Sequence, residues 1–418
     1  MSTVTLDVKK KKMLVPKLRF REFEEEWKYE AIGKYIDLIS GIAFKGEDIS
    51  EDSIGVPILR GINITEGYIR HNKNIDRYFL GNTDKLDKIR LKEGDLVLGM
   101  DGSKVGKNSA LITKNDVDSL LIQRVARLRA KKNASLQFIY LHINSVLFHK
   151  YVDIVNTSSG IPHISSKQIN DFKIHFPQFP EQQKIASFLS RVDEKIQQFI
   201  RKKKLLEQYK KGIMQQLFSG KLRFKDENGE DYPDWKEKKL GEVCDIVGGG
   251  TPDTNITEYW GGEIQWFTPT EIKSDFVSNS IRTITELGLK KSSAKKLPIG
   301  TILLTTRATI GEVSISLKEC STNQGFQSLI VRKENSNVFI FNWIKKNKHE
   351  LISKANGSTF PEISKTAIEK ILLNVPSLPE QQKIATFLSS IDVKIESTNQ
   401  QITKAKKFKK GLLQQMFP

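Results

Sequence analysis

The sequence contains one segment twice, and this repeat constrains the fold more than any other feature. Residues 180–186 are Pro-Glu-Gln-Gln-Lys-Ile-Ala, and residues 379–385 are the same. The likeness continues to a Lys-Lys-Gly-x-x-Gln-Gln-x-Phe run at 210–218 and again at 409–417. Such self-similarity predicts two units of one kind in tandem. We therefore expect a first body, a first tail, a second body and a second tail, at residues 1–179, 180–218, 219–378 and 379–418.

The two bodies correspond more faintly than the two tails. Residues 18–20, Leu-Arg-Phe, match residues 222–224, and residues 159–165 match residues 358–364. Both bodies contain short apolar stretches punctuated by glycine and proline, which is typical of strands and turns, together with stretches of helical periodicity. Tails that stay alike indicate one shared role, and bodies that diverge indicate two different roles of one kind.

Apolar residues recur along both tails at steps of three and four, the pattern of a coiled-coil seam. Pro180 and Pro379 stand near the first turn, where a helix tolerates proline. At 1.5 Å per residue, about 38 residues form a rod of about 57 Å. The candidate residues for helix pairing and partner docking are Ile185, Leu189, Val192, Ile196, Phe199, Ile384, Leu388, Ile391, Ile395 and Ile402.

A seam of this length can be buried in two ways. Each tail can pack on its own body, or the two tails can pair, and we favour pairing because both are too long for one small body and carry the same seam. The first tail leads into the second body, so a returning second tail makes the pair antiparallel. We expect an α+β fold with two similar domains joined by two long antiparallel coiled-coil helices, an internal pseudo-two-fold repeat with the bodies at opposite ends.

The charge balance favours a polyanionic partner. The chain has 67 Lys and Arg against 49 Asp and Glu, a formal net charge of +18, so nucleic acid is the first candidate. No apolar run approaches the roughly 20 residues of a membrane helix, so no membrane partner is expected. Two cysteines, Cys244 and Cys320, cannot form a disulfide framework, which fits a cytoplasmic location.

Motifs of enzymatic sites are missing from the sequence. There is no GxxxxGK[ST] loop for a nucleotide, and the histidines and cysteines have no metal-ligand spacing. We therefore expect no catalytic residue and no metal site, and a role in binding rather than catalysis.

Four polar or basic loops stand at matching places in both bodies and are suited to contact DNA bases and phosphates. Each loop alone is more simply explained as a solvated turn, but four matches favour a shared surface. The candidate DNA-binding residues are Arg60, Gly61, Asn63, Ser103, Lys104, Lys107, Gln123, Arg124, Ser158, Ser159 and His163 in the first body, and Thr268, Thr270, Thr306, Arg307, Thr309, Asn323, Gln324, Ser358 and Thr359 in the second.

Together these features resemble the specificity (S) subunit of type I restriction-modification systems. The resemblance covers nearly the whole chain and rests on the two Pro-Glu-Gln-Gln-Lys-Ile-Ala helices with their Lys-Lys-Gly-x-x-Gln-Gln-x-Phe ends. Supporting marks are Arg60-Gly61-Ile62-Asn63, Gly94-Asp95 and residues 161–165. One departure matters: Thr268-Pro269 stands where the first body has Arg60-Gly61, so base-reading roles cannot be copied between bodies.

This resemblance implies the partners and the chemistry of the complex. Each body would be a target recognition domain for one half of a bipartite asymmetric site in double-stranded DNA. The helices would set the spacer and dock two methyltransferase (M) subunits, joined by restriction/translocase (R) subunits. Adenine methylation with S-adenosylmethionine, and cleavage with ATP and Mg²⁺, would reside in those partners, leaving no cofactor in this chain.

Two other functions remain open from the residues alone. One is a scaffold whose bodies bind proteins, with the positive charge aiding solubility. The other, a stand-alone nuclease or methyltransferase, is disfavoured by the missing motifs. Salt-dependent DNA binding separates the first alternative from a DNA-reading subunit, because phosphate contacts make affinity fall steeply with salt.

Overall fold

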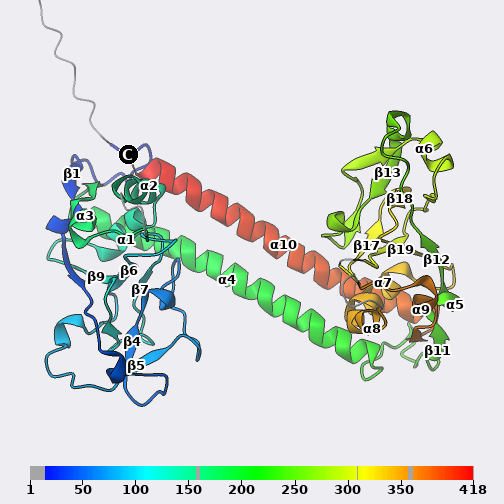
Figure 1. The fold of residues 1–418 in the computed structure, drawn as a ribbon, viewed down its shortest axis with the longest axis horizontal. Coiled ribbons are helices and arrows are strands. Elements are labelled where there is room, and N and C mark those ends of the chain that lie inside the picture. Colours follow the sequence, from blue (N-terminus) through cyan, green and yellow to red (C-terminus); the bar gives the residue numbers. More distant parts are fainter. Residues whose placement is uncertain (1–14, 157–160, 308, 356–360, 418) are drawn as a thin grey trace, which may run out of the picture. The chain divides into compact units, whose positions relative to one another are not determined.

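The computed structural model describes residues 15–156, 161–307, 309–355 and 361–417 (Figure 1). The chain divides into two compact units, one comprising Met1–Gln198 with Ile402–Pro418 and the other Phe199–Gln401. Helix α4 (Phe179–Phe218) passes from the first unit into the second, and helix α10 (Leu378–Met416) passes from the second into the first. Each unit therefore holds one body and a part of both long helices.

The first body combines two four-stranded sheets with three short helices. Its elements are β1 (Lys28–Ala31), β2 (Ile36–Ser40), β3 (Ile49–Ser50), β4 (Val56–Leu59), β5 (Arg77–Phe79), β6 (Leu96–Gly99), β7 (Ser109–Leu111), β8 (Leu120–Leu121), β9 (Val125–Ala130), α1 (Leu136–Ile143), α2 (Val146–Val155), α3 (Ser166–Asp171) and β10 (Lys173–Phe176). The sheet orders are β2-β9-β6-β7 and β3-β5-β4-β8, and β1 pairs with β10. Strands β4 and β8 are parallel.

The second body repeats this plan. Its elements are β11 (Lys236–Lys239), α5 (Leu240–Val243), β12 (Cys244–Gly248), β13 (Trp260–Phe267), β14 (Phe276–Val277), β15 (Arg282–Ile284), α6 (Glu286–Lys290), β16 (Ile302–Leu304), β17 (Val313–Ser316), β18 (Cys320–Thr322), β19 (Gln327–Val331), α7 (Asn337–Lys346), α8 (Lys348–Ser353), α9 (Lys365–Glu369) and β20 (Leu372–Val375). The sheet orders are β12-β19-β16-β17-β14 and β15-β13-β18, β11 pairs with β20, and β13 and β18 are parallel. The expected repeat of an α+β domain is confirmed.

Serines in matching positions begin the helices of the two bodies. Ser135 and Ser336 cap α1 and α7, and the hydroxyl of each accepts a backbone N–H three residues later at 3.3 Å. Ser165 and Ser364, each preceded by an isoleucine, cap α3 and α9 in the same way. These caps satisfy N–H groups that the first helical turn leaves without a partner, so the repeated serines determine where these helices start.

The repeated glutamate fastens each long helix to the body that precedes it. Glu181 is 1% exposed and accepts hydrogen bonds from Nε and Nη2 of Arg19, both at 2.8 Å. Glu380 is fully buried and accepts from Nε and Nη2 of Arg223 at 3.1 and 2.8 Å and from Nε1 of Trp235 at 3.1 Å. Forked charge-assisted bonds of this kind are strong and geometrically specific.

The first repeated glutamine joins the same helices to α1 and α7. Oε1 of Gln182 accepts the Ser135 N–H at 3.0 Å, and Oε1 of Gln381 accepts the Ser336 N–H at 2.8 Å. Each side-chain amide also donates to the carbonyl five residues earlier, at 2.9 Å. The Glu-Gln pair of the repeat therefore has a structural role within the chain.

Replacing Glu380 by Gln is expected to lower the free energy of unfolding of the second unit by about 2 to 3 kcal/mol. The buried carboxylate is lost, and Arg223 and Trp235 lose an acceptor. Solvent screens part of this loss in the free energy of unfolding, because the Arg223 side chain is 26% exposed. Urea unfolding followed by fluorescence measures the change. The matched control is Gln382→Glu on the exposed face of the same turn; an equal midpoint for both variants would contradict the assigned role.

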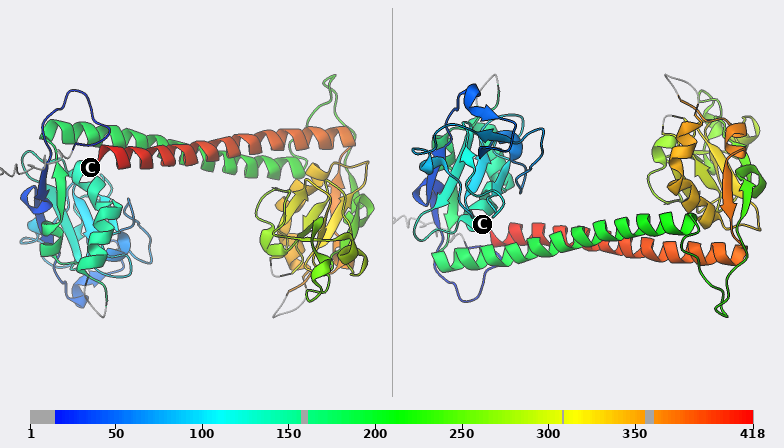
Figure 2. Two further views of the ribbon diagram at one scale, coloured as in Figure 1. Left: turned by 90° about the horizontal axis from the view of Figure 1, so that it is seen from above. Right: turned by 90° about the horizontal axis from the view of Figure 1, so that it is seen from below.

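Within each unit, α4 and α10 pack against each other in opposite directions (Figure 2). In the first unit, Nζ of Lys409 lies 2.6 Å from Asp193. In the second unit, Nζ of Lys210 lies 2.6 Å from Asp392. These are the same repeat positions with the helices exchanged, so residues early in one helix meet residues late in the other. The expected antiparallel pairing is confirmed within each unit.

Most of the predicted seam residues are buried, and several pack against the bodies as well as against the other helix: Ile185 and Leu189 belong to the core of the first body, and Ile384, Leu388 and Ile391 to the core of the second. Val192, Phe199 and Ile395 are half-buried, and the others are at most 8% exposed: Ile185, Leu189, Ile196, Ile384, Leu388, Ile391 and Ile402. The apolar pattern missed Thr398, which is 2% exposed between Ile395 and Ile402 and bonds through its hydroxyl to the Lys394 carbonyl at 2.8 Å. Satisfying its hydroxyl within the helix allows a polar residue in the seam.

Candidate nucleic-acid interface

Four segments of the first body meet where strands of its two sheets end; we call them the first loop cluster. They are residues 60–63 after β4, 100–108 after β6, 123–124 after β8 and 161–165 before α3. The Met100 N–H donates to the Arg124 carbonyl, and the Ile164 N–H donates to the Met100 carbonyl, both at 2.9 Å. The Ile122 N–H donates to the Leu59 carbonyl at 3.4 Å. The backbone therefore holds the four segments together.

The second loop cluster is built in the same way from residues 268–271, 305–307, 309–311, 323–325 and 361–364. The Thr306 N–H donates to the Gly325 carbonyl at 2.8 Å, and the Ile363 N–H donates to the Thr306 carbonyl at 3.3 Å. The Asn323 N–H donates to the Phe267 carbonyl at 3.0 Å. Three of the four loops matched in the sequence thus lie together in both bodies. The fourth, residues 156–160 and 356–360, lies outside the described residues except for Asn156, and the segments that follow it, 161–165 and 361–364, are part of the clusters.

The structure shifts one residue match between the clusters. The Gly106 N–H donates to the Gly99 carbonyl at 3.3 Å, and the Gly311 N–H donates to the Thr305 carbonyl at 3.0 Å. Gly99 therefore corresponds to Thr305, and position 101 corresponds to position 307. Aligning the loop at 102–107 with the loop at 306–311 from the sequence alone places residue 102 opposite residue 306. That match is wrong by two positions, because small residues fill both loops and the first loop is longer.

The candidate contact residues differ in exposure. The exposed ones are Ser103, Lys104, Gln123, Arg124, His163, Thr270, Arg307, Thr309 and Gln324, and the half-buried ones are Arg60, Gly61, Lys107, Thr268 and Asn323. Four further candidates lie outside the described residues: Ser158, Ser159, Ser358 and Thr359.

Two candidates point into the protein. Asn63 is 1% exposed; its Nδ2 donates to Asp76 at 2.9 Å, and its Oδ1 accepts the Arg60 N–H at 3.2 Å. Thr306 is fully buried, and its hydroxyl donates to the Gly325 carbonyl at 3.1 Å. Both side chains hold the loops in place, so we omit them from the proposed interface. Residue type alone did not separate such groups from exposed ones.

Carboxylates accompany the basic residues of the first loop cluster. Oδ2 of Asp101 lies 3.1 Å from Nη1 of Arg124, and Oε1 of Glu66 lies 2.9 Å from Nζ of Lys104. The hydrogen bond from Lys104 lowers the pKa of Glu66 below its ordinary value. A search for basic and amide groups missed these acids, although Asp101 directly precedes the predicted basic loop.

The second loop cluster presents different groups. Nε of Arg307 lies 2.8 Å from Oε1 of Glu362, which occupies the position of His163. The Thr268 hydroxyl donates to Glu271 at 2.7 Å, and Gln324 accepts a hydrogen bond from the Thr251 hydroxyl. The two clusters therefore share a backbone framework and differ in the charges placed on it.

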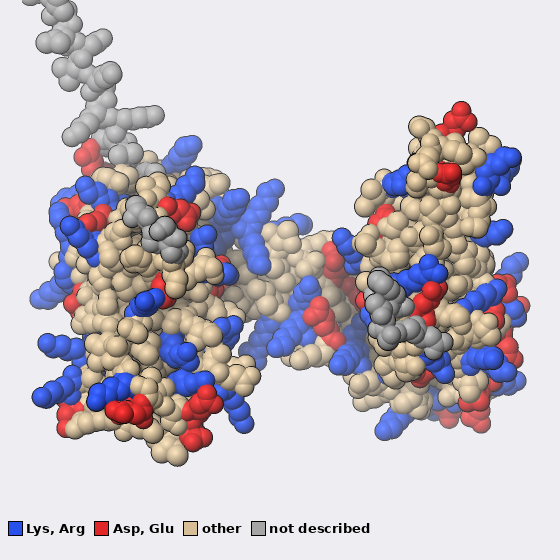
Figure 3. Space-filling view, viewed as in Figure 1, with Lys and Arg blue, Asp and Glu red and all other residues tan. Residues whose placement is uncertain are grey.

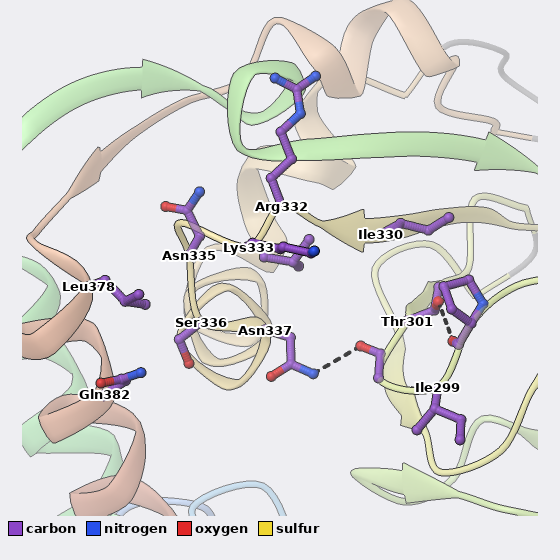
Figure 4. A pocket seen from close by; sticks show the side chains of 13 residues that line it. Ile299, Thr301, Ile330, Arg332, Lys333, Asn335, Ser336, Asn337, Leu378 and Gln382 are labelled. Atoms are coloured by element: carbon purple, nitrogen blue, oxygen red, sulfur yellow. Dashed lines mark hydrogen bonds between the residues drawn. The ribbon is translucent and has the colours of Figure 1, made fainter.

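Cavities lie in both bodies. One of about 560 Å³ is bounded in the first loop cluster by Asp101, Arg124 and His163. Figure 4 shows another of about 330 Å³ in the second body, near the start of α7, where Asn337 donates to the Gly300 carbonyl at 3.0 Å. No residue of the second loop cluster lines it, so it is not part of the candidate interface.

Burial raises the pKa of Cys244 to about 12 and that of Cys320 to about 11, so both thiols stay protonated at neutral pH.

Over residues 15–417, apart from the gaps, no three His, Cys, Asp or Glu side chains are arranged to hold a metal ion. Figure 3 shows Lys and Arg side chains on the visible face of both bodies, interspersed with Asp and Glu.

No helix in the described part of the chain is both long enough and apolar enough to cross a membrane.

Known proteins are similar to this chain in sequence or in fold. The chain is 38% identical over 190 residues to the type I restriction enzyme MjaIX specificity subunit of Methanocaldococcus jannaschii, an alignment that spans 44% of each chain. It is 28% identical to that organism's putative MjaX specificity subunit over 94% of this chain and 93% of the relative. A crystal structure of the type I S subunit from M. genitalium superposes with a TM-score of 0.61 over 97% of this chain and 99% of the other at 17% identity, which shows the shared fold.

The family model described as the type I restriction modification DNA specificity domain matches residues 24–208 and 232–407. These two matches each contain one body with most of the long helix that follows it. They cover most of the chain, in the order of the internal repeat. The chain belongs to the family of type I restriction modification DNA specificity proteins.

Proposed function

We propose that the chain is the DNA-binding specificity subunit of a type I restriction-modification complex, and that each body reads one half of a bipartite asymmetric site in double-stranded DNA. The observation that carries this proposal is the pair of loop clusters, alike in backbone and unlike in side chains. Asp101 in the first loop cluster corresponds to Arg307 in the second, and His163 corresponds to Glu362. Equal frameworks with unequal donors and acceptors would contact two different half-sites.

The helix pair would set the spacer between the half-sites. Both helices are continuous over 40 and 39 residues, and the seam and the Lys–Asp pairs lock them side by side within each unit. A stiff connection restricts the distance between two DNA-reading surfaces, as dimer geometry does in other DNA-binding proteins.

The outer faces of the helices would dock two methyltransferase (M) subunits. Most seam residues cannot serve this purpose as well, because seven of the ten are at most 8% exposed. The aromatic residues Tyr209 and Phe408 occupy the same repeat position on opposite helices and are 51% and 58% exposed. Gly212 and Gly411 follow at i+3, and a Cβ added to either would meet nothing within 4 Å. Two equal surfaces on one chain would take two copies of one partner.

The catalysis would reside in those partners and in restriction/translocase (R) subunits. The chain itself is the non-catalytic component, which agrees with the names of its relatives as specificity subunits. It would direct adenine methylation with S-adenosylmethionine by the M subunits and ATP- and Mg²⁺-dependent cleavage by the R subunits.

Duplex binding that weakens steeply with salt is the expected signature of this function. With six to ten phosphate contacts, affinity should fall about 10³- to 10⁵-fold between 50 and 200 mM salt. The chain assembled with its M subunits is titrated with a duplex that contains its site, and an equally long duplex with one half-site scrambled serves as control. Equal affinity for both duplexes would contradict the reading of two half-sites, and no binding to either would favour a protein-binding scaffold.

A further inference from the structure

Arg124, in the turn between β8 and β9, has a strained backbone. Its φ is +64°, and its side chain is 60% exposed. Among the described residues, Asp118 and Asn133 are the other non-glycine residues with positive φ, and both types tolerate this region. A long side chain in left-handed conformation costs free energy that glycine would avoid. The position therefore keeps a guanidinium at the cost of strain.

The neighbouring arginines on β9 have internal partners. Arg127 is 1% exposed and paired with Asp37, and Arg129 bonds to both carboxylate oxygens of Asp95 at 2.7 and 2.6 Å. Arg124 differs in exposure: its side chain is 60% exposed, against 2% for that of Arg127 and 34% for that of Arg129. Its one side-chain acceptor among the described residues is Asp101, through Nη1. Within the described part of the chain, the other N–H groups of its guanidinium have no hydrogen-bond partner, so they can bind a ligand.

In the second body the exposed arginine lies on a different loop. Gly325 stands at the position of Arg124 and is buried. Arg307 stands at the position of Asp101 and is held by Glu362 at 2.8 Å. Each cluster thus displays one exposed arginine held by one carboxylate, in a different place on the common framework.

We propose that Arg124 and Arg307 each contact one guanine, at different positions of the two half-sites. This inference rests on the proposed function. A guanidinium fork matches O6 and N7 of guanine in the major groove. A carboxylate beside the fork orients it and lowers the local positive potential, which disfavours a phosphate and leaves a neutral base edge as the better partner. The different loops place the two guanines differently in each half-site.

The Arg124→Gly substitution removes the proposed base contact without lowering the stability of the fold. Glycine relieves the left-handed strain and loses more entropy on folding, so the two effects offset and the melting temperature should stay within about 2 °C of wild type. Preference for guanine at one base pair of the first half-site should fall about 10- to 100-fold. Arg124→Lys is the control that keeps the charge and loses the fork; it should bind DNA and still lose that preference.

The full-length chain assembled with its M subunits is used for selection from a randomised duplex library, as wild type, Arg124→Gly, Arg124→Lys and Arg307→Lys. The expected result is loss at one position of one half-site for both Arg124 variants and at one position of the other half-site for Arg307→Lys. If wild type selects a bipartite site and the variants keep every preference, or weaken all sequences equally, this inference is overturned while the proposed function stands. If wild type selects no sequence, both fail.

Discussion

Lengthening both long helices by four residues, after Phe199 in α4 and after Gln400 in α10, is expected to lengthen the preferred spacer by one or two base pairs. Four helical residues add about 6 Å, and one base pair rises about 3.4 Å. The original site should then lose one half-site contact and bind about 1,000-fold more weakly. The insertion is placed in both helices because a change in one alone would shift the seam and the Lys–Asp pairs out of register.

Selection from duplexes that carry the two half-sites at varied spacing measures this change. The matched control inserts four residues into the exposed turn at 226–229, which lengthens the chain by the same amount and leaves both helices unchanged. An unchanged spacer in the helix variant, with wild-type affinity for the original site, would exclude the helices as the element that sets the distance. Changed half-site sequences would show that the insertion disturbed the bodies instead.

Glutamate at Tyr209 or Phe408 is expected to remove one docked M subunit, and the double variant to remove both. These exposed aromatic residues have the character of interface hot spots, whose loss costs about 2 to 4 kcal/mol of binding free energy. Light scattering on the co-purified complex counts the M subunits per chain. Gln208→Glu, one residue along the helix on another face, is the control. Two M subunits retained by the double variant would place docking elsewhere.

Gly212 and Gly411, three residues after Tyr209 and Phe408, allow a second test of M-subunit docking. A mid-helix glycine costs about 0.5 to 1 kcal/mol relative to alanine, and a Cβ added at Gly212 or Gly411 would meet no atom of the described residues within 4 Å. Gly212→Ala with Gly411→Ala should therefore raise the melting temperature of the free chain and weaken M binding, because a methyl group would stand where a partner backbone approaches. A variant that is stabilised and binds M normally would contradict this close approach.

The repeat and its apolar period allowed most of the architecture to be predicted. Heptad-like spacing is a local property, so Ile185, Leu189, Ile384 and Leu388 could be assigned to a buried seam before any contact was known. Thr398 escaped because its hydroxyl is satisfied by its own helix, which no hydrophobic pattern reports. The helix-starting serines Ser135 and Ser336 likewise follow local capping rules.

The loops of the candidate interface could be predicted from the sequence, but which of their side chains are exposed could not. Composition placed Asn63 and Thr306 with the exposed candidates, although the fold buries both and uses their hydrogen-bonding groups internally. It also gave no weight to Asp101 and Glu362, whose importance comes from the arginines across from them. Which polar group faces solvent depends on how several segments close on one another.

The sequence by itself determined that this chain is a duplicated unit with a long helix after each body, because repetition and periodicity are written along the chain. Only the tertiary structure decided that Arg124 and Arg307 each face a single carboxylate in corresponding loop clusters, and that Arg124 is strained. Those properties arise where strands distant in sequence end together, and no local pattern encodes the distance between their loops.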